Sequence, residues 1–186
     1  MIYINKIVSL RDKITEESHK TCLSTTSIWI MYPGIISYKN NVLVNTNIFI
    51  ITCAASMIHW SWYKKDGFHH MFDIICAHCT IIFHICGYGL RIPNMYLLGI
   101  ILLGIIYFYN LACSYSIGTY YGLVNHLLFR YLCFWGATIC YIPIDLYIFI
   151  INTFFYLLSI YLILNYPQNI NLINVVLFGT INLLCL

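Results

Sequence analysis

Side chains that could do chemistry gather in two short stretches of an otherwise apolar sequence. The first contains Ser56, His59 and Asp73, and the second contains His126 and Arg130. Imidazoles bind metals and transfer protons, a carboxylate can orient or deprotonate water, and a hydroxyl can donate to a developing oxyanion. Inserting an Asp or Arg side chain into the hydrocarbon core of a membrane costs about 2.5–3.5 kcal/mol on insertion scales. Ionisable residues within apolar segments that could span a membrane are therefore candidate functional residues.

Helical spacing places these side chains in pairs. Ser56 and His59 are three residues apart, and His126 and Arg130 are four residues apart. Residues at these separations share one face of an α-helix. Each pair is therefore expected to point in one direction from its helix.

The composition indicates the class of protein to which these side chains belong. Of 186 residues, 61% are hydrophobic and 8% are charged, whereas ordinary globular domains are about 45–50% apolar and about 25% charged. This composition predicts an integral membrane protein whose partners are membrane lipids. The formal net charge is only +3, and no basic patch is dense enough to neutralise a phosphate backbone, so we expect no nucleic-acid partner.

The apolar segments predict an all-α fold, a polytopic transmembrane helix bundle of six or seven spans. A span needs about 20 residues at 1.5 Å each. Residues 1–23 are expected to form an N-terminal polar or amphipathic segment and residues 24–186 the transmembrane helical domain. A short run at 28–38, interrupted by Pro33 and Gly34 and preceded by candidate helix caps at 24–27, spans, re-enters or lies on the surface. The clear spans are 42–60, 71–90, 95–113, 115–142, 146–164 and 170–186.

The chain direction then brings the polar residues to one leaflet. Ser56 and His59 end one span, and Asp73 begins the next after a short turn. Two crossings later the chain returns to the same side, where His126 and Arg130 lie just inside the following span. All five are expected at one depth, whichever way the protein is inserted.

The nine cysteines are expected to be small hydrophobes of the bundle. They lie inside or beside apolar runs and not in exposed loops. Cys76 and Cys79 form a Cys-x-x-Cys pair in the middle of a predicted helix, with no second pair to complete a zinc site. Redox or structural zinc chemistry is not expected there.

The arrangement of these motifs resembles the CREST superfamily, which includes alkaline ceramidases and the progestin and adipoQ receptors. The resemblance covers residues 53–137 and rests on the Ser and His that end one helix, the Asp that opens the next, and the stretch from Asn125 to Arg130. It implies a seven-helix protein that holds zinc on three histidines. The implied activity is hydrolysis of a lipid amide or ester.

Carried over by position, the resemblance assigns a role to each residue. His59 and His126 would be zinc ligands, Asp73 would orient or deprotonate the metal-bound water, and Ser56 would bond to the oxyanion. Arg130 stands where the third histidine is expected, and a guanidinium cannot coordinate a metal. His70, or its neighbours among the histidines of the same span, would have to complete the ligand set, and Arg130 would bind a lipid phosphate.

The same residues also fit a protein without catalysis. In that hypothesis Asp73 and Arg130 form an ion pair that fixes helix packing, with the histidines hydrogen-bonded beside it. A transporter is the third hypothesis, less well supported because the sequence has neither repeats nor an acidic ring. The heavy use of Ile, Asn and Tyr resembles small multi-pass proteins of large DNA viruses and AT-rich protists.

Overall fold

The part of the chain that the structure describes is built entirely from helices. The computed structural model describes residues 14–63, 67–87, 95–141 and 146–166. The expectation of an all-α fold is confirmed for these ranges. The elements are α2 (Glu16–Thr26), the 3₁₀ helix η1 (Ser27–Ile30), α3 (Met31–Lys39), α4 (Leu43–Ser61), α5 (Phe68–Gly87), α6 (Met95–Ser114), α7 (Tyr120–Thr138) and α8 (Leu146–Asn165).

Helices α4 to α8 fall where apolar segments were expected, with small differences at their ends. The largest difference is at α7, which is shorter than the expected segment 115–142. Gly118 has a positive φ of 87°, and the Thr119 side chain then caps the helix by accepting from the Gly122 N–H. These two residues set the start of α7. The expected segment 170–186 and most of the N-terminal segment 1–23 lie outside the described residues.

Helix α2 begins earlier than the sequence analysis expected. Thr15 is its N-cap, and Thr15 and Ser18 form a reciprocal capping box. The expected caps at 24–27 are wrong, because these hydroxyls lie inside helical structure. Thr26 and Ser27 donate to carbonyls one turn earlier, a pattern that Ser and Thr side chains adopt within helices. The expected domain boundary between residues 23 and 24 falls within α2.

The helical path continues through η1 into α3. Pro33 has no N–H for the carbonyl four residues earlier, and the tighter 3₁₀ turn of η1 lies just before it. Gly34 lets α3 approach α4, because a Cβ at this position would lie 3.0 Å from Cβ of Phe49. Pro33 and Gly34 are therefore accommodated inside α3 and do not end it.

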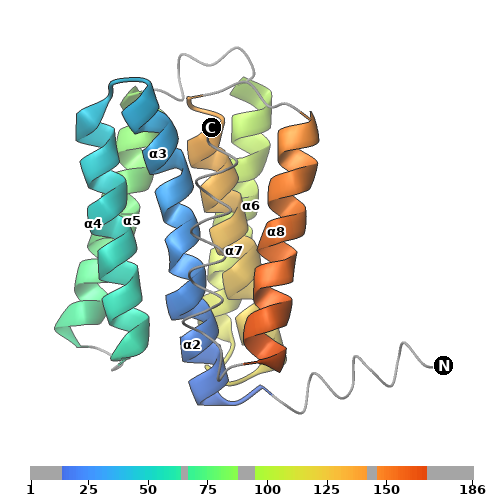
Figure 1. Cartoon of the computed structure of the whole chain (residues 1–186). Helices are drawn as coiled ribbons and strands as arrows, with labels where there is room; N and C mark the ends of the chain where they lie inside the picture. The colour runs from blue at the N-terminus through green and yellow to red at the C-terminus, as the bar shows by residue number, and fades with distance from the viewer. Residues whose placement is uncertain (1–13, 64–66, 88–94, 142–145, 167–186) are drawn as a thin grey trace.

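The helices stand side by side and alternate in direction (Figure 1). The path α2–η1–α3 runs through the middle of the view, with α4 and α5 on one side and α6, α7 and α8 on the other. Helix α4 packs against α2, α3 and α5, and α6 packs closely against α7. The main core cluster includes Trp29, Tyr32, Leu123 and Phe134, all under 4% exposed.

Two described helices, α4 and α6, are long and apolar enough to cross a bilayer. The shorter segment Phe149–Asn165 of α8 is also apolar. Length and composition therefore support membrane association of the chain.

Candidate functional site

The guanidinium of Arg130 lies at the centre of the polar cluster. Its Nη1 donates to the Leu23 carbonyl and lies 3.2 Å from Oγ1 of Thr26 and 3.0 Å from Oγ of Ser27. Its Nη2 lies 2.9 Å from Oγ of Ser56. One side chain of α7 is thus joined to α2, η1 and α4.

Ser56 lies beside this guanidinium. The Ser56 oxygen accepts from Nη2 of Arg130, and the Ser27 hydroxyl lies 3.2 Å away. The carboxylate of Asp73 on α5 lies near enough to interact with both Ser56 and Arg130. A hydroxyl has one proton and two acceptor sites. Ser56 can therefore accept from Arg130 and Ser27 and still has a proton to donate.

Asp73 and Arg130 do not form the direct ion pair that the non-catalytic hypothesis expected. In residues 14–63, 67–87, 95–141 and 146–166, the salt bridge present is Lys20 to Glu16, at 2.5 Å on the surface of α2. Both residues are half-buried, and their charges interact across a longer distance. Ser56, beside them, is 5% exposed, so the charges interact in a region with little water.

The two histidines expected as zinc ligands both contact the ring of Trp60. The Trp60 ring is 4.7 Å from the His59 ring and 5.3 Å from the His126 ring, measured between centroids. The guanidinium carbon of Arg130 is 5.6 Å from the centroid of Trp60. Trp60 thus gathers two imidazoles and a cation around one indole.

His59 is paired with His70 of α5. Their nearest ring nitrogens, Nε2 of His59 and Nδ1 of His70, are 3.4 Å apart. The other nitrogen of His59 is buried and has no hydrogen-bond partner within the described part of the chain. The sequence analysis placed these two histidines together correctly, on the end of α4 and the start of α5.

His126 contacts a histidine that the sequence analysis did not select. The ring of His19, on α2, meets the ring of His126 edge to face with 5.5 Å between centroids. His19 is fully buried. The sequence does contain a signal for this position. The i, i+3, i+4, i+7 spacing of a helix face that packs inward is present at His19, Cys22, Leu23 and Thr26. The charged residues near His19 make the segment polar on average, so this spacing was not recognised.

The expected zinc set is only partly assembled. Two ligands of a tetrahedral zinc with bonds of about 2.0–2.1 Å lie about 3.3–3.4 Å apart, which is the separation of the His59 and His70 nitrogens. His126 donates from Nδ1 to the Gly122 carbonyl, leaving Nε2 as an acceptor, as metal-bound histidines commonly do. However, no group of three His, Cys, Asp or Glu side chains among the described residues could hold a metal.

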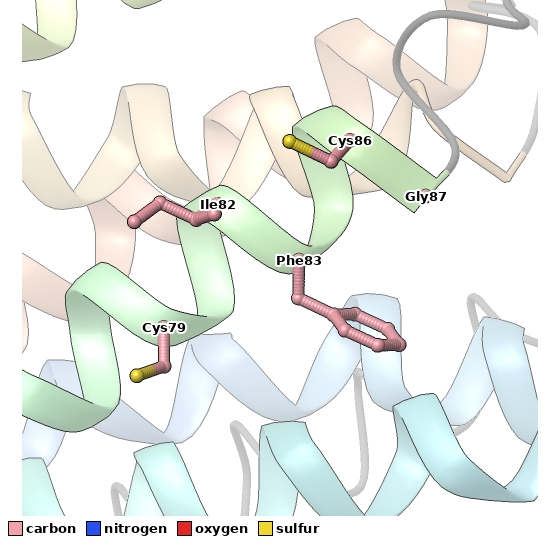
Figure 2. Close-up of a pocket in the computed structure, with 5 residues that line it drawn as sticks. All are labelled: Cys79, Ile82, Phe83, Cys86 and Gly87. Atoms are coloured by element: carbon pink, nitrogen blue, oxygen red, sulfur yellow. The ribbon is translucent and has the colours of Figure 1, made fainter.

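A separate apolar hollow lies on the outer face of α5, lined by Cys79, Ile82, Phe83, Cys86 and Gly87 (Figure 2). It contains no carboxylate, imidazole or cation. Cys76 and Cys79 lie within α5 and are free, as are the other described cysteines. The hollow therefore offers none of the chemistry of the Arg130 cluster.

Comparison of the chain with protein-family models, curated proteins and solved structures finds no match.

Proposed function

We propose that this chain is a multi-pass integral membrane protein and that its buried Arg130 cluster joins helices rather than catalysing a reaction. The observation that carries the proposal is the set of acceptors around Arg130: a backbone carbonyl and three hydroxyls from α2, η1 and α4. The Nη groups that would bind a lipid phosphate are the groups that these protein acceptors engage.

The exposed surface supports insertion into a bilayer. On α6, Ile100 and Leu103 are 67% and 70% exposed, and on α8, Phe154 and Leu157 are 60% and 59% exposed. Apolar patches of this kind on a water-soluble monomer usually mark an interaction site or an aggregation hazard. In a bilayer the same side chains contact acyl chains without that cost.

A count of seven spans follows from treating residues 16–39 as the first. Residues 21–38 contain no Asp, Glu, Lys or Arg, and 18 residues at 1.5 Å cover about 27 Å of the roughly 30 Å hydrocarbon core. The path α2–η1–α3 lies alongside α4 (Figure 1). Helices α4 to α8 supply five more spans, and the apolar segment 170–186 supplies the last.

A buried arginine suits a joint between helices. Its planar fork can donate in several fixed directions, and the Leu23 carbonyl and the hydroxyls of Thr26, Ser27 and Ser56 lie in those directions. Asp73 supplies an opposite charge nearby. In this proposal the CREST-like pattern persists as a structural core, with Arg130 in the place of a metal ligand.

A zinc-dependent lipid hydrolase is the second candidate, and one observation favours it. The 3.4 Å between the His59 and His70 nitrogens fits two ligands of one tetrahedral zinc. Zinc supplies a Lewis acid and an acidic bound water when it is present. His126 would have to move closer to His59 and His70 to become the third ligand, and Asp73 and Ser56 would serve the reaction as the resemblance implies.

Metal content separates the two candidates. We expect protein purified in detergent after zinc supplementation to contain far less than one zinc per chain. About one zinc per chain, lost in both His59→Ala and His70→Ala, would overturn the structural proposal and support the hydrolase. Hydrolysis of short-chain lipid esters and amides is then the assay to add.

Replacing Arg130 by His gives a second, independent test. A structural joint predicts that R130H is less stable than the wild type and still binds no zinc, because imidazole cannot reach the same four acceptors. An eroded metal site predicts that R130H gains tightly bound zinc and unfolds at a higher temperature when zinc is added. Lys39→His, on an exposed residue, controls for nonspecific binding by an added imidazole.

The number of spans can be tested by labelling from the lipid phase. A hydrophobic carbene precursor dissolved in liposomes should label exposed side chains of α5, α6 and α8, such as Ile82, Leu103 and Phe154, as read by mass spectrometry. Leu123, which is 1% exposed, is the internal control. Labelling confined to α4 and α6 would contradict a seven-span protein.

A further inference from the structure

The pair formed by His19 and His126 has a donor and an acceptor that the Arg130 cluster does not use. The two rings come from α2 and α7 and meet edge to face, 5.5 Å apart. The tautomer of each ring is fixed by a hydrogen bond from or to the backbone. These tautomers determine what the pair can bind.

His19 presents a buried donor. The backbone N–H of Gly118 lies 3.0 Å from Nδ1 of His19 and donates to it, so Nδ1 carries a lone pair and the ring is neutral. A neutral imidazole with no proton on Nδ1 carries its proton on Nε2. His19 is fully buried, and its Nε2 has no hydrogen-bond partner within residues 14–63, 67–87, 95–141 and 146–166.

His126 presents an acceptor. Its Nδ1 lies 3.0 Å from the carbonyl oxygen of Gly122, and a carbonyl can only accept, so Nδ1 carries the proton. In the neutral ring, Nε2 of His126 then has a free lone pair. Adjacent rings from two helices thus offer one N–H and one lone pair.

We propose that His19 and His126 bind a single hydroxyl group between them, which accepts from Nε2 of His19 and donates to Nε2 of His126. A hydroxyl offers an acceptor and a donor on one oxygen. A carboxylate or phosphate has no proton for His126, and an ammonium has no lone pair for His19. A metal ion is excluded as the shared ligand, because Nε2 of His19 keeps its proton while Gly118 donates to Nδ1.

The surroundings suit a hydroxyl carried by water or by a lipid alcohol. The Trp60 ring lies parallel to the His19 ring at 6.2 Å and meets the His126 ring edge to face at 5.3 Å. Gly122 lets α7 pack closely against His19, because a Cβ there would lie 3.4 Å from Cε1 of His19 and 2.8 Å from the Ser116 carbonyl oxygen. The aromatic wall would cover the apolar part of an alcohol.

This proposal goes beyond the proposed function and does not depend on it. Arg130 can act as a structural joint whether or not His19 and His126 hold a hydroxyl. The hydroxyl can also be present if the protein proves to be an enzyme. The proposed function and the shared hydroxyl are therefore tested by different experiments.

The test uses the full chain, labelled with ¹⁵N-histidine, in detergent micelles. Long-range ¹H–¹⁵N spectra should show the proton of His19 on Nε2 and the proton of His126 on Nδ1. The His19 Nε2 proton should give a cross peak to water, or to the glycerol protons of added dioctanoylglycerol if a lipid alcohol displaces water. Either source supports the proposal. The opposite tautomer at either histidine, or a His19 proton with neither cross peak, overturns it.

His19→Asn is the sharper variant, because an asparagine side chain can place an acceptor near Gly118 while lacking the distant Nε2 donor. We expect the Nε2 resonance of His126 to move toward the position of a nitrogen without a hydrogen bond. His78 is the matched reference, since its Nδ1 also contacts a carbonyl one turn earlier, that of Ile74 at 2.8 Å, while its ring is exposed. An unchanged His126 resonance in well-folded His19→Asn would contradict the shared hydroxyl.

Discussion

Arg130 donates to Ser56 across 2.9 Å and thereby links α7 to α4. This contact is one of four that a single guanidinium makes with acceptors on neighbouring elements. The carboxylate of Asp73 on α5 lies near enough to interact with both residues. Hydrogen bonds therefore join α7 to α4 at the candidate site, with a charge of α5 beside them.

Replacing Arg130 by Met should destabilise the protein strongly. The change leaves the carboxylate of Asp73 without its nearest cation and leaves buried hydroxyls without their donor. A hydrogen bond to a charged group typically contributes about 1.5–3 kcal/mol, and several are lost here, so we expect a loss of about 3 kcal/mol or more. Thermal unfolding in detergent, followed by circular dichroism, measures the effect.

Two further variants interpret that result. Arg130→Lys keeps the charge and loses the planar fork, so its unfolding temperature should lie between those of the wild type and the Met variant. Lys39→Met removes an exposed cation and should change stability by less than about 0.5 kcal/mol. Arg130→Met with wild-type stability would show that the cluster contributes little to the fold.

Ser56→Ala should cost about 1–2 kcal/mol, because the Arg130 donor loses a buried acceptor and the Ser27 hydroxyl loses a partner. Ser61→Ala is the matched control on the same helix. Its hydroxyl lies 2.8 Å from Oγ of Ser24 in an exposed position, and we expect a smaller loss. A double variant with Arg130→Lys should be less destabilised than the sum of the single changes; strict additivity would mean that the two residues act separately.

Gly118→Ala should destabilise the connection between α6 and α7. Gly118 has φ of +87°, and a Cβ there would lie 3.0 Å from the backbone nitrogen of Glu16. A left-handed conformation costs an L-residue about 1–2 kcal/mol, and the close approach adds to this. Gly99→Ala is the control, since its Cβ would meet nothing within 4 Å and alanine favours a helix by up to about 1 kcal/mol. Equal effects of the two changes on the unfolding temperature would be inconsistent with this account.

Gly136→Leu should separate α7 from α6. A Cβ at Gly136 would lie only 3.2 Å from Cγ2 of Ile101, and small residues permit close helix packing in membranes. Overpacking of this kind typically costs about 1–3 kcal/mol. The unfolding temperature and the protease resistance of α6 should both decrease. Gly87→Leu, where nothing lies within 4 Å of the Cβ, should leave both nearly unchanged.

Much of the fold followed from hydropathy, because a long apolar segment can satisfy its backbone hydrogen bonds within itself by forming a helix. Helix α6 begins at Met95 as expected and ends one residue beyond the expected 113. The start of α2 did not follow. Glu16, Glu17 and Lys20 made this segment resemble a polar tail, while its inward face carries His19 and Leu23, both fully buried. Hydropathy averaged along the chain cannot separate two faces of one helix.

The sequence predicted which residues would lie near one another in the site better than it predicted the contacts among them. Helix spacing and chain direction brought Ser56, His59, Asp73, His126 and Arg130 to one end of the bundle. The acceptors of Arg130 were not foreseen, because Leu23 contributes a backbone carbonyl that any residue type would supply. Nor was the contact of Trp60 with both His59 and His126, which depends on the rotation of α4 about its axis.

The distance along the chain between Arg130 and its acceptors has a consequence for biosynthesis. Leu23 and Ser56 are 107 and 74 residues ahead of Arg130, so the ribosome makes them first. Domains generally form from the N-terminal end as the chain emerges. When α7 is synthesised, the acceptors of its guanidinium are therefore already present in the earlier helices, and the packing of α7 depends on their prior assembly.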